Sequence, residues 1–333
     1  MTGVALRLGT RRSALALAQS QQVADALAAA SGRPVHLVPI VSEGDVTRAS
    51  LASLGGTGVF ATRLREALLA GECDLLVHSL KDLPTAQPEG LVIAATPVRA
   101  DARDVVVTKN GTPLQSLSSG ATVGTGSPRR VAQVRRRNPR VDVRDLRGNV
   151  DSRLGRVRDG ELDAVVLAAA GLARLDPDDG GLQREALGLT EWPTAPGQGA
   201  LAIETREDAE ADLRAAIALL EDDATRIAVT AERAVLATLE AGCHAPVGVY
   251  ADIADGDLRI RAVVYELDGS HRIALDRTIR LTPGYARDKG SGNGADAADD
   301  ANPIARAARA GSEVARRLLE RGAADVVTRE STQ

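Results

Sequence analysis

The sequence predicts an α/β protein with two open sheets and a smaller C-terminal α+β domain. From residue 4 to about residue 95, short β-rich runs alternate with helical apolar patterns. The same alternation restarts near residue 105, and after about residue 246 it changes to three successive strands and one helix. Repeated strand–helix units are typical of open, mostly parallel sheets, so we expect two of them.

The two stretches contain similar elements. In the first, we expect strands at 5–8, 35–41, 74–79 and 91–95, and helices at 13–30 and about 60–70. In the second, we expect strands at 105–108, 122–124, 141–146 and 163–168, with helices that begin at Pro128 and Val150. A strand at 200–204 and helices near 208–220 and 225–240 follow the turn-rich segment 192–199.

The C-terminal part has a different character. Strands are expected at 247–251, 258–266 and 271–281, and a closing helix at 303–321. Residues 284–302 are rich in Gly, Ala and Asp without apolar periodicity, so a disordered insertion is expected there. We therefore expect three domains: residues 1–98 with 199–219, residues 99–198, and residues 220–333.

Composition narrows the class of protein. The 333 residues carry a formal net charge of −4 and include only two cysteines, too few for a disulfide framework or a cysteine-rich zinc site. No secretory signal and no apolar stretch of membrane-spanning length are evident, so we expect a cytoplasmic protein with no membrane association and no metal. One Phe, one Trp and three Tyr make nucleic-acid binding by base stacking unfavourable.

Three predicted helix starts combine glycine, a capping residue and arginine. They are RLGTRRS (7–13), GTGSPRR (124–130) and LRGNV (146–150), with Ser13, Ser127 and Asn149 as expected caps. Arginine opposes the positive end of a helix dipole by about 0.3–1 kcal/mol, so its repeated presence indicates an anionic ligand. Such loops gather at the carboxyl ends of strands. The alternative is that solvated arginines reflect an arginine-rich composition. The run 135–137 ends a helix and is interpreted as a solvated helix end.

The polar exit of the strand at 74–79 brings Ser79, Lys81 and Asp82 to the same edge. Lysine otherwise occurs only at 109 and 289, so Lys81 beside Asp82 indicates either a catalytic pair or a structural ion pair. His78 lies within the apolar run and is interpreted as a core histidine.

The cysteines differ in context. Cys243 follows a predicted helix C-terminus, where the dipole does not favour a thiolate, so from the spacing alone it is either functional or inert. Cys73 precedes a buried strand and is interpreted as structural.

Several segments in order resemble the hydroxymethylbilane synthase family, also called porphobilinogen deaminase. They are RLGTRRSALALAQ (7–19), EGD (43–45), GGTGVF (55–60), VHSLKDLPT (77–85), RADARD (99–104), VGTGSPRR (123–130), LRGNVDSRL (146–154), LAAAGLARL (167–175), APGQGALAIE (195–204) and AGCHAPVG (241–248). The resemblance implies two α/β domains similar to periplasmic binding proteins and a third domain with the cysteine loop. It departs at Ser53 and Thr57, where many relatives have lysine, and in the 284–302 insertion.

The resemblance also implies the functional residues. Asp82 is expected to be the catalytic carboxylate, and a dipyrromethane cofactor made from the substrate is expected on Cys243 through a thioether. The other residues expected to hold the cofactor are Ser79, Lys81, Thr125, Ser127, Arg129, Arg130, Arg147 and Gly148. Those expected to bind the substrate and growing chain are Arg11, Ser13, Phe60, Arg153, Arg174 and Gln198.

The activity implied is a transferase reaction of porphyrin and heme biosynthesis. Four porphobilinogen molecules are joined head to tail with loss of ammonia, and water releases the linear tetrapyrrole hydroxymethylbilane. We expect a monomer. The alternatives are a non-catalytic anion-binding protein on the same fold and a different amine-releasing transferase. The mass of the purified protein, together with a colour test with an aldehyde reagent for dipyrromethanes, distinguishes them.

Overall fold

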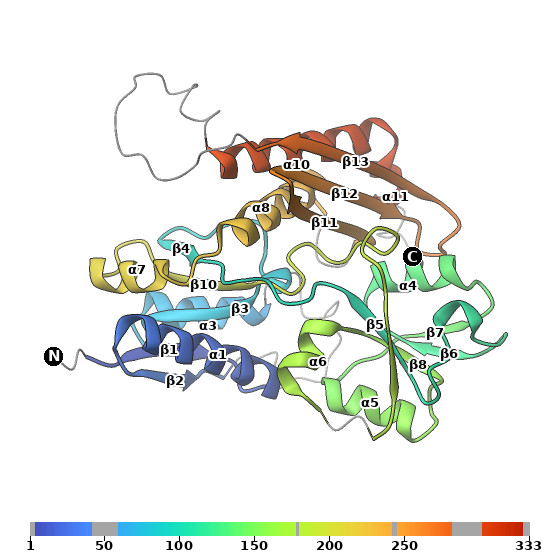
Figure 1. The fold of residues 1–333 in the computed structure, drawn as a ribbon, viewed down its shortest axis with the longest axis horizontal. Coiled ribbons are helices and arrows are strands. Elements are labelled where there is room, and N and C mark those ends of the chain that lie inside the picture. Colours follow the sequence, from blue (N-terminus) through green and yellow to red (C-terminus); the bar gives the residue numbers. More distant parts are fainter. Residues whose placement is uncertain (1–3, 42–58, 178–179, 242–244, 282–301, 329–333) are drawn as a thin grey trace. The chain divides into compact units, whose positions relative to one another are not determined.

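The computed structural model describes residues 4–41, 59–177, 180–241, 245–281 and 302–328 (Figure 1). The chain divides into two compact units. The first consists of Met1–Asp101, Ala170–Pro177 and Gln198–Thr225, and the second of Ala102–Ala169, Asp178–Gly197 and Arg226–Gln333. No helix in the described ranges is long and apolar enough to cross a membrane. The boundaries of three domains stay a prediction.

The first unit is built on a five-stranded sheet with the order β2-β1-β3-β10-β4. Its strands are β1 (Leu6–Thr10), β2 (Val35–Pro39), β3 (Leu75–Ser79), β4 (Leu91–Ala95) and β10 (Leu201–Arg206). Its helices are α1 (Ala14–Ser31), α3 (Val59–Leu69), the 3₁₀ turn η1 (Leu80–Asp82) and α7 (Ala211–Ala218), and most of α6 (Ala169–Leu175) also belongs to this unit.

The alternating side chains of β3 pack this sheet on both faces. Leu75 and Val77 join the core that includes residues of α1 and α7, whereas Leu76 joins the core with residues of α3. Local signals fix the ends of α1, because Ser13 accepts a hydrogen bond from the Ala16 N–H and Gly32 ends the helix at a φ of 67°.

The second unit contains another five-stranded sheet with the order β7-β6-β8-β5-β9. Its strands are β5 (Asp104–Thr108), β6 (Thr122–Gly124), β7 (Asp142–Arg144), β8 (Ala164–Ala168) and β9 (Gln183–Ala186). The accompanying helices are η2 (Leu114–Ser116), α4 (Pro128–Arg137) and α5 (Val150–Arg158). Pro128 occupies the first turn of α4, where its missing N–H removes no helical bond.

The prediction of mostly parallel sheets is confirmed for strand direction, because four of the five strands in each sheet run the same way and one strand in each is reversed. In the first sheet β10 runs antiparallel to both β3 and β4, and in the second β5 runs antiparallel to both β8 and β9. A parallel neighbour requires a crossover connection, usually a helix. The strands β5 and β10 each follow a point where the chain passes from one unit to the other, at about 101 and 198, and therefore do not enter their sheets through a helical crossover.

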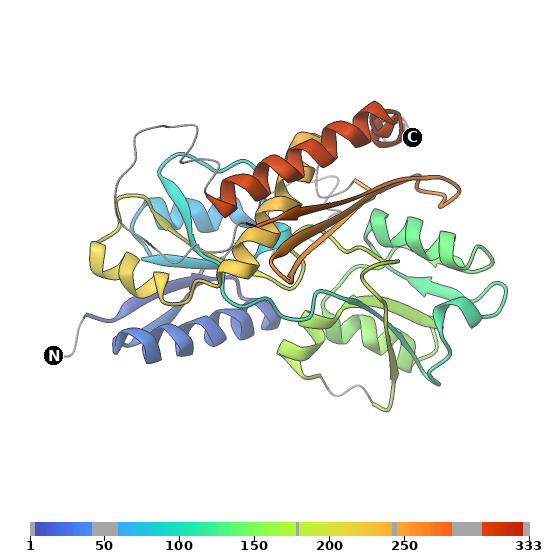
Figure 2. The ribbon, with the colours of Figure 1, turned by 45° about the horizontal axis from the view of Figure 1, so that its top comes forward.

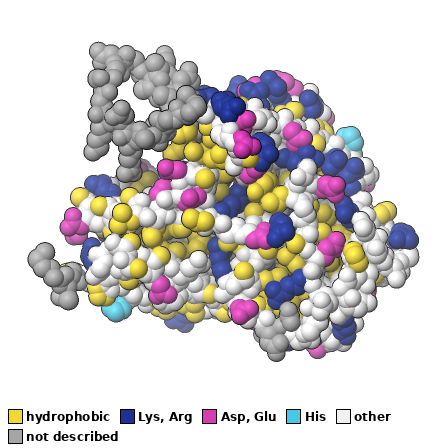
Figure 3. Space-filling view, viewed as in Figure 1, with side chains coloured by type: hydrophobic (Ala, Val, Ile, Leu, Met, Phe, Trp, Pro, Cys, Tyr) yellow, Lys and Arg dark blue, Asp and Glu magenta, His cyan; other side chains and the backbone are white. Residues whose placement is uncertain are grey.

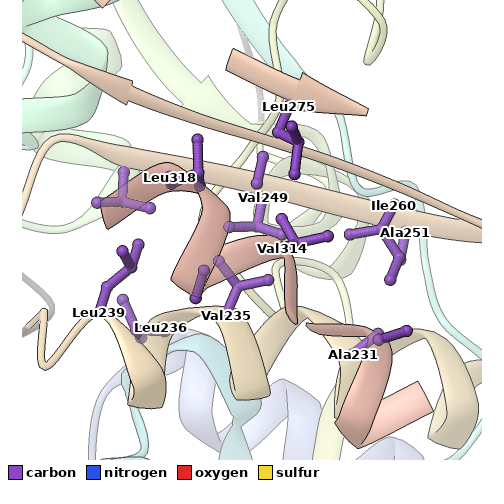
Figure 4. Close-up of a cluster of buried hydrophobic side chains, with 14 of the residues drawn as sticks. Ala231, Val235, Leu236, Leu239, Val249, Ala251, Ile260, Leu275, Val314 and Leu318 are labelled. Atoms are coloured by element: carbon purple, nitrogen blue, oxygen red, sulfur yellow. The ribbon is translucent and has the colours of Figure 1, made fainter. Parts of the chain in front are cut away.

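The rest of the second unit is an antiparallel sheet, β11 (Val247–Ala254), β12 (Asp257–Tyr265) and β13 (Arg272–Arg280), covered by helices on one face. The helices are α8 (Asp223–Thr238), α10 (Pro303–Glu320) and α11 (Ala323–Thr328), and Figure 2 shows α10 lying along the strands. Val235, Val249 and Val314 meet in the apolar core between them (Figure 4). Basic side chains gather over the strands of this sheet in Figure 3.

Most predicted elements are confirmed within a few residues. The helices α6 and α11 and the edge strand β9 were not predicted. The expected insertion lies outside the described residues except for Asn302, whose side chain caps α10 by accepting from the Ile304 N–H at 2.9 Å.

Candidate active site

In the first unit, two predicted site loops lie at the same edge of the sheet. The strands β1 and β3 are parallel neighbours, so their carboxyl ends point to the same side. Arg11 and Ser13 follow β1, and Ser79 ends β3. The hydroxyl of Ser79 lies 2.9 Å from Nε2 and 3.2 Å from Oε1 of Gln19, a buried residue of α1. The sheet therefore brings the loop after β1 beside the loop that carries Asp82.

The turn η1 presents Asp82 to solvent. Leu80 is buried and its N–H donates to the carbonyl of Ala200 at 3.0 Å, which holds the turn against the segment before β10. Asp82, two residues later, is exposed, and Lys81 is half-buried. The Lys81 ammonium donates to Oε1 of Gln198 at 3.3 Å. The carboxylate of Asp82 is thus available to a ligand, whereas Lys81 contacts an amide from a distant segment.

Two arginines of the first unit bind the backbone beside Gln198. Arg174 of α6 donates to the Gly199 carbonyl at 2.9 Å, and Arg99 donates to the Gln198 carbonyl at 2.8 Å. Burial lowers the pKa of Arg174. Its Nε is buried and, among the described residues, has no hydrogen-bond partner. These contacts assemble Lys81, Gln198 and Arg174 from three separate segments.

In the second unit, the parallel strands β6, β7 and β8 direct another set of loops to one edge. Thr125 is buried and its hydroxyl accepts from the Ser127 N–H at 3.3 Å. Ser127 occupies the N-cap position of α4 as predicted, but its side chain makes no capping hydrogen bond. A Cβ on Gly126 would lie 2.7 Å from the Leu146 carbonyl oxygen, so these two loops touch through backbone.

The loop after β7 adds further positive charge. Arg147 is exposed, with Nε 3.2 Å from Asp145, and Arg153 in the first turn of α5 donates to the Gly148 carbonyl at 2.9 Å. Gly148 has a φ of 109°, which favours glycine. Burial lowers the pKa of Arg153, and the charges of Arg130 and Arg147 lower it further. The guanidiniums are therefore close enough to repel one another.

Arg129 and Arg130 are placed differently from Arg147. Both are buried, and both pair with the fully buried Asp104 of β5, at 2.9 Å and 2.6 Å. The indole of Trp192 donates to the same carboxylate at 2.9 Å. Gln133 accepts from Arg129 and donates to the Tyr265 hydroxyl at 3.1 Å. Asp104 was not predicted as a site residue, and only its place in the RADARD segment pointed to it.

The structure thus gathers the predicted residues into two sets, one on each unit. The first set is Arg11, Ser13, Ser79, Lys81, Asp82, Arg174 and Gln198, and the second is Thr125, Ser127, Arg129, Arg130, Arg147, Gly148 and Arg153. Cys243 lies outside the described residues, as does the side chain of Phe60, although Phe60 itself belongs to α3.

His78 and Cys73 are buried, in accordance with their predicted structural roles. Nε2 of His78 lies 3.0 Å from Oε2 of Glu204, which is fully buried. Burial and the charge of Asp74 raise the pKa of the Cys73 thiol to about 11. The thiol is therefore protonated at neutral pH and lies within the apolar core beside α3.

Comparison with known proteins identifies the family. One family model, described as porphobilinogen deaminase, dipyromethane cofactor binding domain, matches residues 6–214. Another, described as porphobilinogen deaminase, C-terminal domain, matches residues 226–320. A porphobilinogen deaminase of Leifsonia xyli subsp. xyli is 52% identical over 325 residues, covering 97% of this chain and 94% of the relative. Porphobilinogen deaminase 1 of Streptomyces coelicolor is 56% identical over 287 residues, covering 84% and 89%.

Solved structures give a distant likeness. An arginine-specific periplasmic binding protein of Salmonella typhimurium is 14% identical, with a TM-score of 0.36 over 66% of this chain and 92% of that chain. An ancestral cationic amino acid solute binding protein is 16% identical, with a TM-score of 0.41 over 65% and 87%. The family models and the relatives together cover nearly the whole chain, and the chain belongs to the porphobilinogen deaminase family.

Proposed function

We propose that this chain joins four porphobilinogen molecules head to tail, releasing ammonia at each step, and then releases hydroxymethylbilane by hydrolysis. Family membership supports the reaction. The observation that carries the proposal is the exposed carboxylate of Asp82 at the carboxyl edge of the first sheet, beside Lys81. We assign the protein to the cytoplasm and expect it to act as a monomer.

The arginines of the second unit suit an acidic ligand. Burial lowers the pKa of Arg153, and the nearby charges of Arg130 and Arg147 lower it further. A bound carboxylate would offset this repulsion among guanidiniums that are protonated at neutral pH. A dipyrromethane group is acidic, and we propose that Cys243 holds it through a thioether while Arg147 and Arg153 bind its carboxylates. When bound, the group supplies the pyrrole carbon to which the first substrate is joined.

Asp82 is proposed to act on the reacting substrate. Loss of ammonia from porphobilinogen leaves an electron-poor azafulvenium whose positive charge spreads to the ring nitrogen. A carboxylate near the pyrrole N–H stabilises that charge electrostatically and accepts a proton when the new carbon–carbon bond has formed. Lys81, held by Gln198, is suited to bind a substrate carboxylate.

The buried pair of arginines has a supporting role in this scheme. Arg129 and Arg130 share the single carboxylate of Asp104, which offsets only one of their two positive charges, so we assign them to holding the first turn of α4 and the local positive potential. Arg147 is exposed and Arg153 half-buried, and we assign direct binding of acetate and propionate groups to these two.

The test of Asp82 is Asp82→Asn with Glu89→Gln as a matched control, because Glu89 is an exposed acid on the same loop. Asp82→Asn should fold, keep its cofactor and lose roughly 10²-fold or more in kcat, since the charge-stabilising group is removed. Glu89→Gln should keep its turnover. Near-normal ammonia release by Asp82→Asn would contradict the role, and binding of porphobilinogen by the wild-type protein without ammonia release would favour the non-catalytic alternative.

The test of Cys243 is the intact mass of the purified protein. The wild-type protein should carry a two-pyrrole increment and give a coloured product with an aldehyde reagent for dipyrromethanes. Cys243→Ser should lack both, whereas Cys73→Ala should keep both. An increment retained in Cys243→Ser would place the attachment elsewhere.

A further inference from the structure

Glu204 of β10 is the centre of a buried polar cluster in the first unit. Its side chain is fully buried, and Arg65 of α3 donates to it at 2.8 Å. Burial alone would raise the pKa of Glu204, but hydrogen bonds from His78 and Arg65 lower it to about 2. The carboxylate is therefore ionised and can only accept hydrogen bonds, so His78 must donate through Nε2.

The same carboxylate contacts both flanks of the loop that carries Asp82. His78 lies in β3 just before Ser79, and its Nε2 is 3.0 Å from Oε2 of Glu204. Gln87 lies beyond the loop, and its Nε2 donates to Oε1 of Glu204 at 3.1 Å. His78 contacts Oε2 and Gln87 contacts Oε1, so one carboxylate binds the residues on both sides of the segment 79–86. We call this arrangement the Glu204 clamp.

A second contact with the same part of the chain restrains the turn within this segment. The Leu80 N–H donates to Ala200, one residue before β10, and the Leu83 N–H closes the turn on the Leu80 carbonyl. Leu80 and Leu83 are both buried. Asp82 lies between these two leucines and is exposed, so its direction depends on how the turn and its flanks are held.

We propose that Glu204 is a positioning residue for the reaction: through His78 and Gln87 it fixes both flanks of the loop and so directs the Asp82 carboxylate. The proposal rests on the role given to Asp82 above. A misplacement of about 1 Å in a catalytic group is enough to reduce a rate by roughly 10²-fold.

Gln87→Ala tests the clamp without disturbing the core. Gln87 lies at the surface, so the variant removes the downstream contact, together with the 3.1 Å bond from the same Nε2 to the Leu91 carbonyl, and leaves the contacts of Glu204 with Arg65 and His78 in place. We expect kcat to fall roughly tenfold or more, with little change in KM, cofactor content or Tm. Gln21→Ala is the matched control, because Gln21 is another exposed glutamine whose amide contacts a carboxylate, that of Asp25, away from this loop.

Rescue separates positioning from a structural role. Gln87→Lys restores a donor that reaches the Glu204 carboxylate and should recover most of the turnover lost in Gln87→Ala. A structural contact alone would lower Tm in Gln87→Ala while kcat per cofactor-loaded molecule stayed unchanged, and that result would overturn the proposal.

The two proposals fail differently. Loss of turnover in Asp82→Asn together with full turnover in Gln87→Ala would overturn the clamp and leave the catalytic role of Asp82 standing. Full turnover in Asp82→Asn would overturn both.

Discussion

Replacing Asp104 by Asn should destabilise the second unit strongly. The carboxylate of Asp104 is fully buried and is the shared partner of Arg129 and Arg130, which are 3% and 6% exposed. Asn has the same shape but no charge. Both carboxylate oxygens of Asp104 accept hydrogen bonds, so the amide NH₂ group of Asn would replace one acceptor and point at N–H donors. The variant would therefore leave two buried guanidiniums without their counter-charge.

The expected magnitude follows from the burial of all three groups. Removing one partner of a buried ion pair typically costs about 3–5 kcal/mol, because the remaining charge is left desolvated. The Trp192 indole also loses a charged acceptor at 2.9 Å. Since the whole free energy of unfolding of a domain is about 5–15 kcal/mol, the loss should be a large fraction of it.

Urea unfolding followed by tryptophan fluorescence measures this effect locally. Trp192 is the single tryptophan of the chain and donates to Asp104, so its transition reports on the second unit. The matched control is Asp142→Asn, because the side chains of Arg144 and Asp142 form a pair at 2.9 Å that is 58% and 52% exposed. That variant should change stability by no more than about 0.5 kcal/mol. An Asp104→Asn midpoint equal to the control's would refute the reasoning.

Three further predictions concern other parts of the chain. The pKa of Glu204 in the folded protein, about 2, lies below its usual value of 4.5. Its ionised side chain therefore contributes about 3 kcal/mol to the free energy of unfolding above pH 4.5, and this contribution is lost as the pH falls toward 2. The difference in unfolding free energy between the wild-type protein and Glu204→Gln should therefore narrow over that range, and a constant difference would contradict the assignment. Cys73 is buried and its thiol has a pKa of about 11, so it should not react with iodoacetamide at pH 8 until urea unfolds the protein. Peptide mass spectrometry measures the labelling, and rapid labelling of the native protein would count against the burial of this thiol. Gly126→Ala should lower stability by about 1–3 kcal/mol, because its Cβ would lie 2.7 Å from the Leu146 carbonyl oxygen. Gly155 is a helical position with open space around it, so Gly155→Ala should instead raise stability by about 1 kcal/mol. Thermal unfolding of the two variants measures both changes.

The elements that the sequence predicted well are those with local signals. The helix α1 has a serine cap and a terminal glycine, and α4 has proline in its first turn, so their ends follow from side chains within a few residues. The strand β9 was missed because its sequence, Gln-Arg-Glu-Ala, has no apolar alternation and it lies at the sheet edge. Its pairing with β5 depends on a strand about 75 residues earlier in the chain.

The family motifs indicated which residues to expect at the site, but not what each of them contacts. Arg129, Arg130 and Arg147 form one arginine-rich set in the sequence, yet the structure buries the first two against Asp104 and leaves the third exposed. No spacing rule predicts this, because Asp104 and its partner Trp192 are separated by 88 residues.

By itself, the sequence determined the succession of strands and helices, the arginine-rich composition of the loops and the family. Those properties depend on short segments whose conformation and chemistry are largely local. Only the tertiary structure decided the antiparallel entry of β5 and β10, the shared pairing of two arginines with Asp104, and the hold of Glu204 on His78 and Gln87. These contacts join residues distant in the chain, and their stability comes from burial, which exists only once the sheets have assembled.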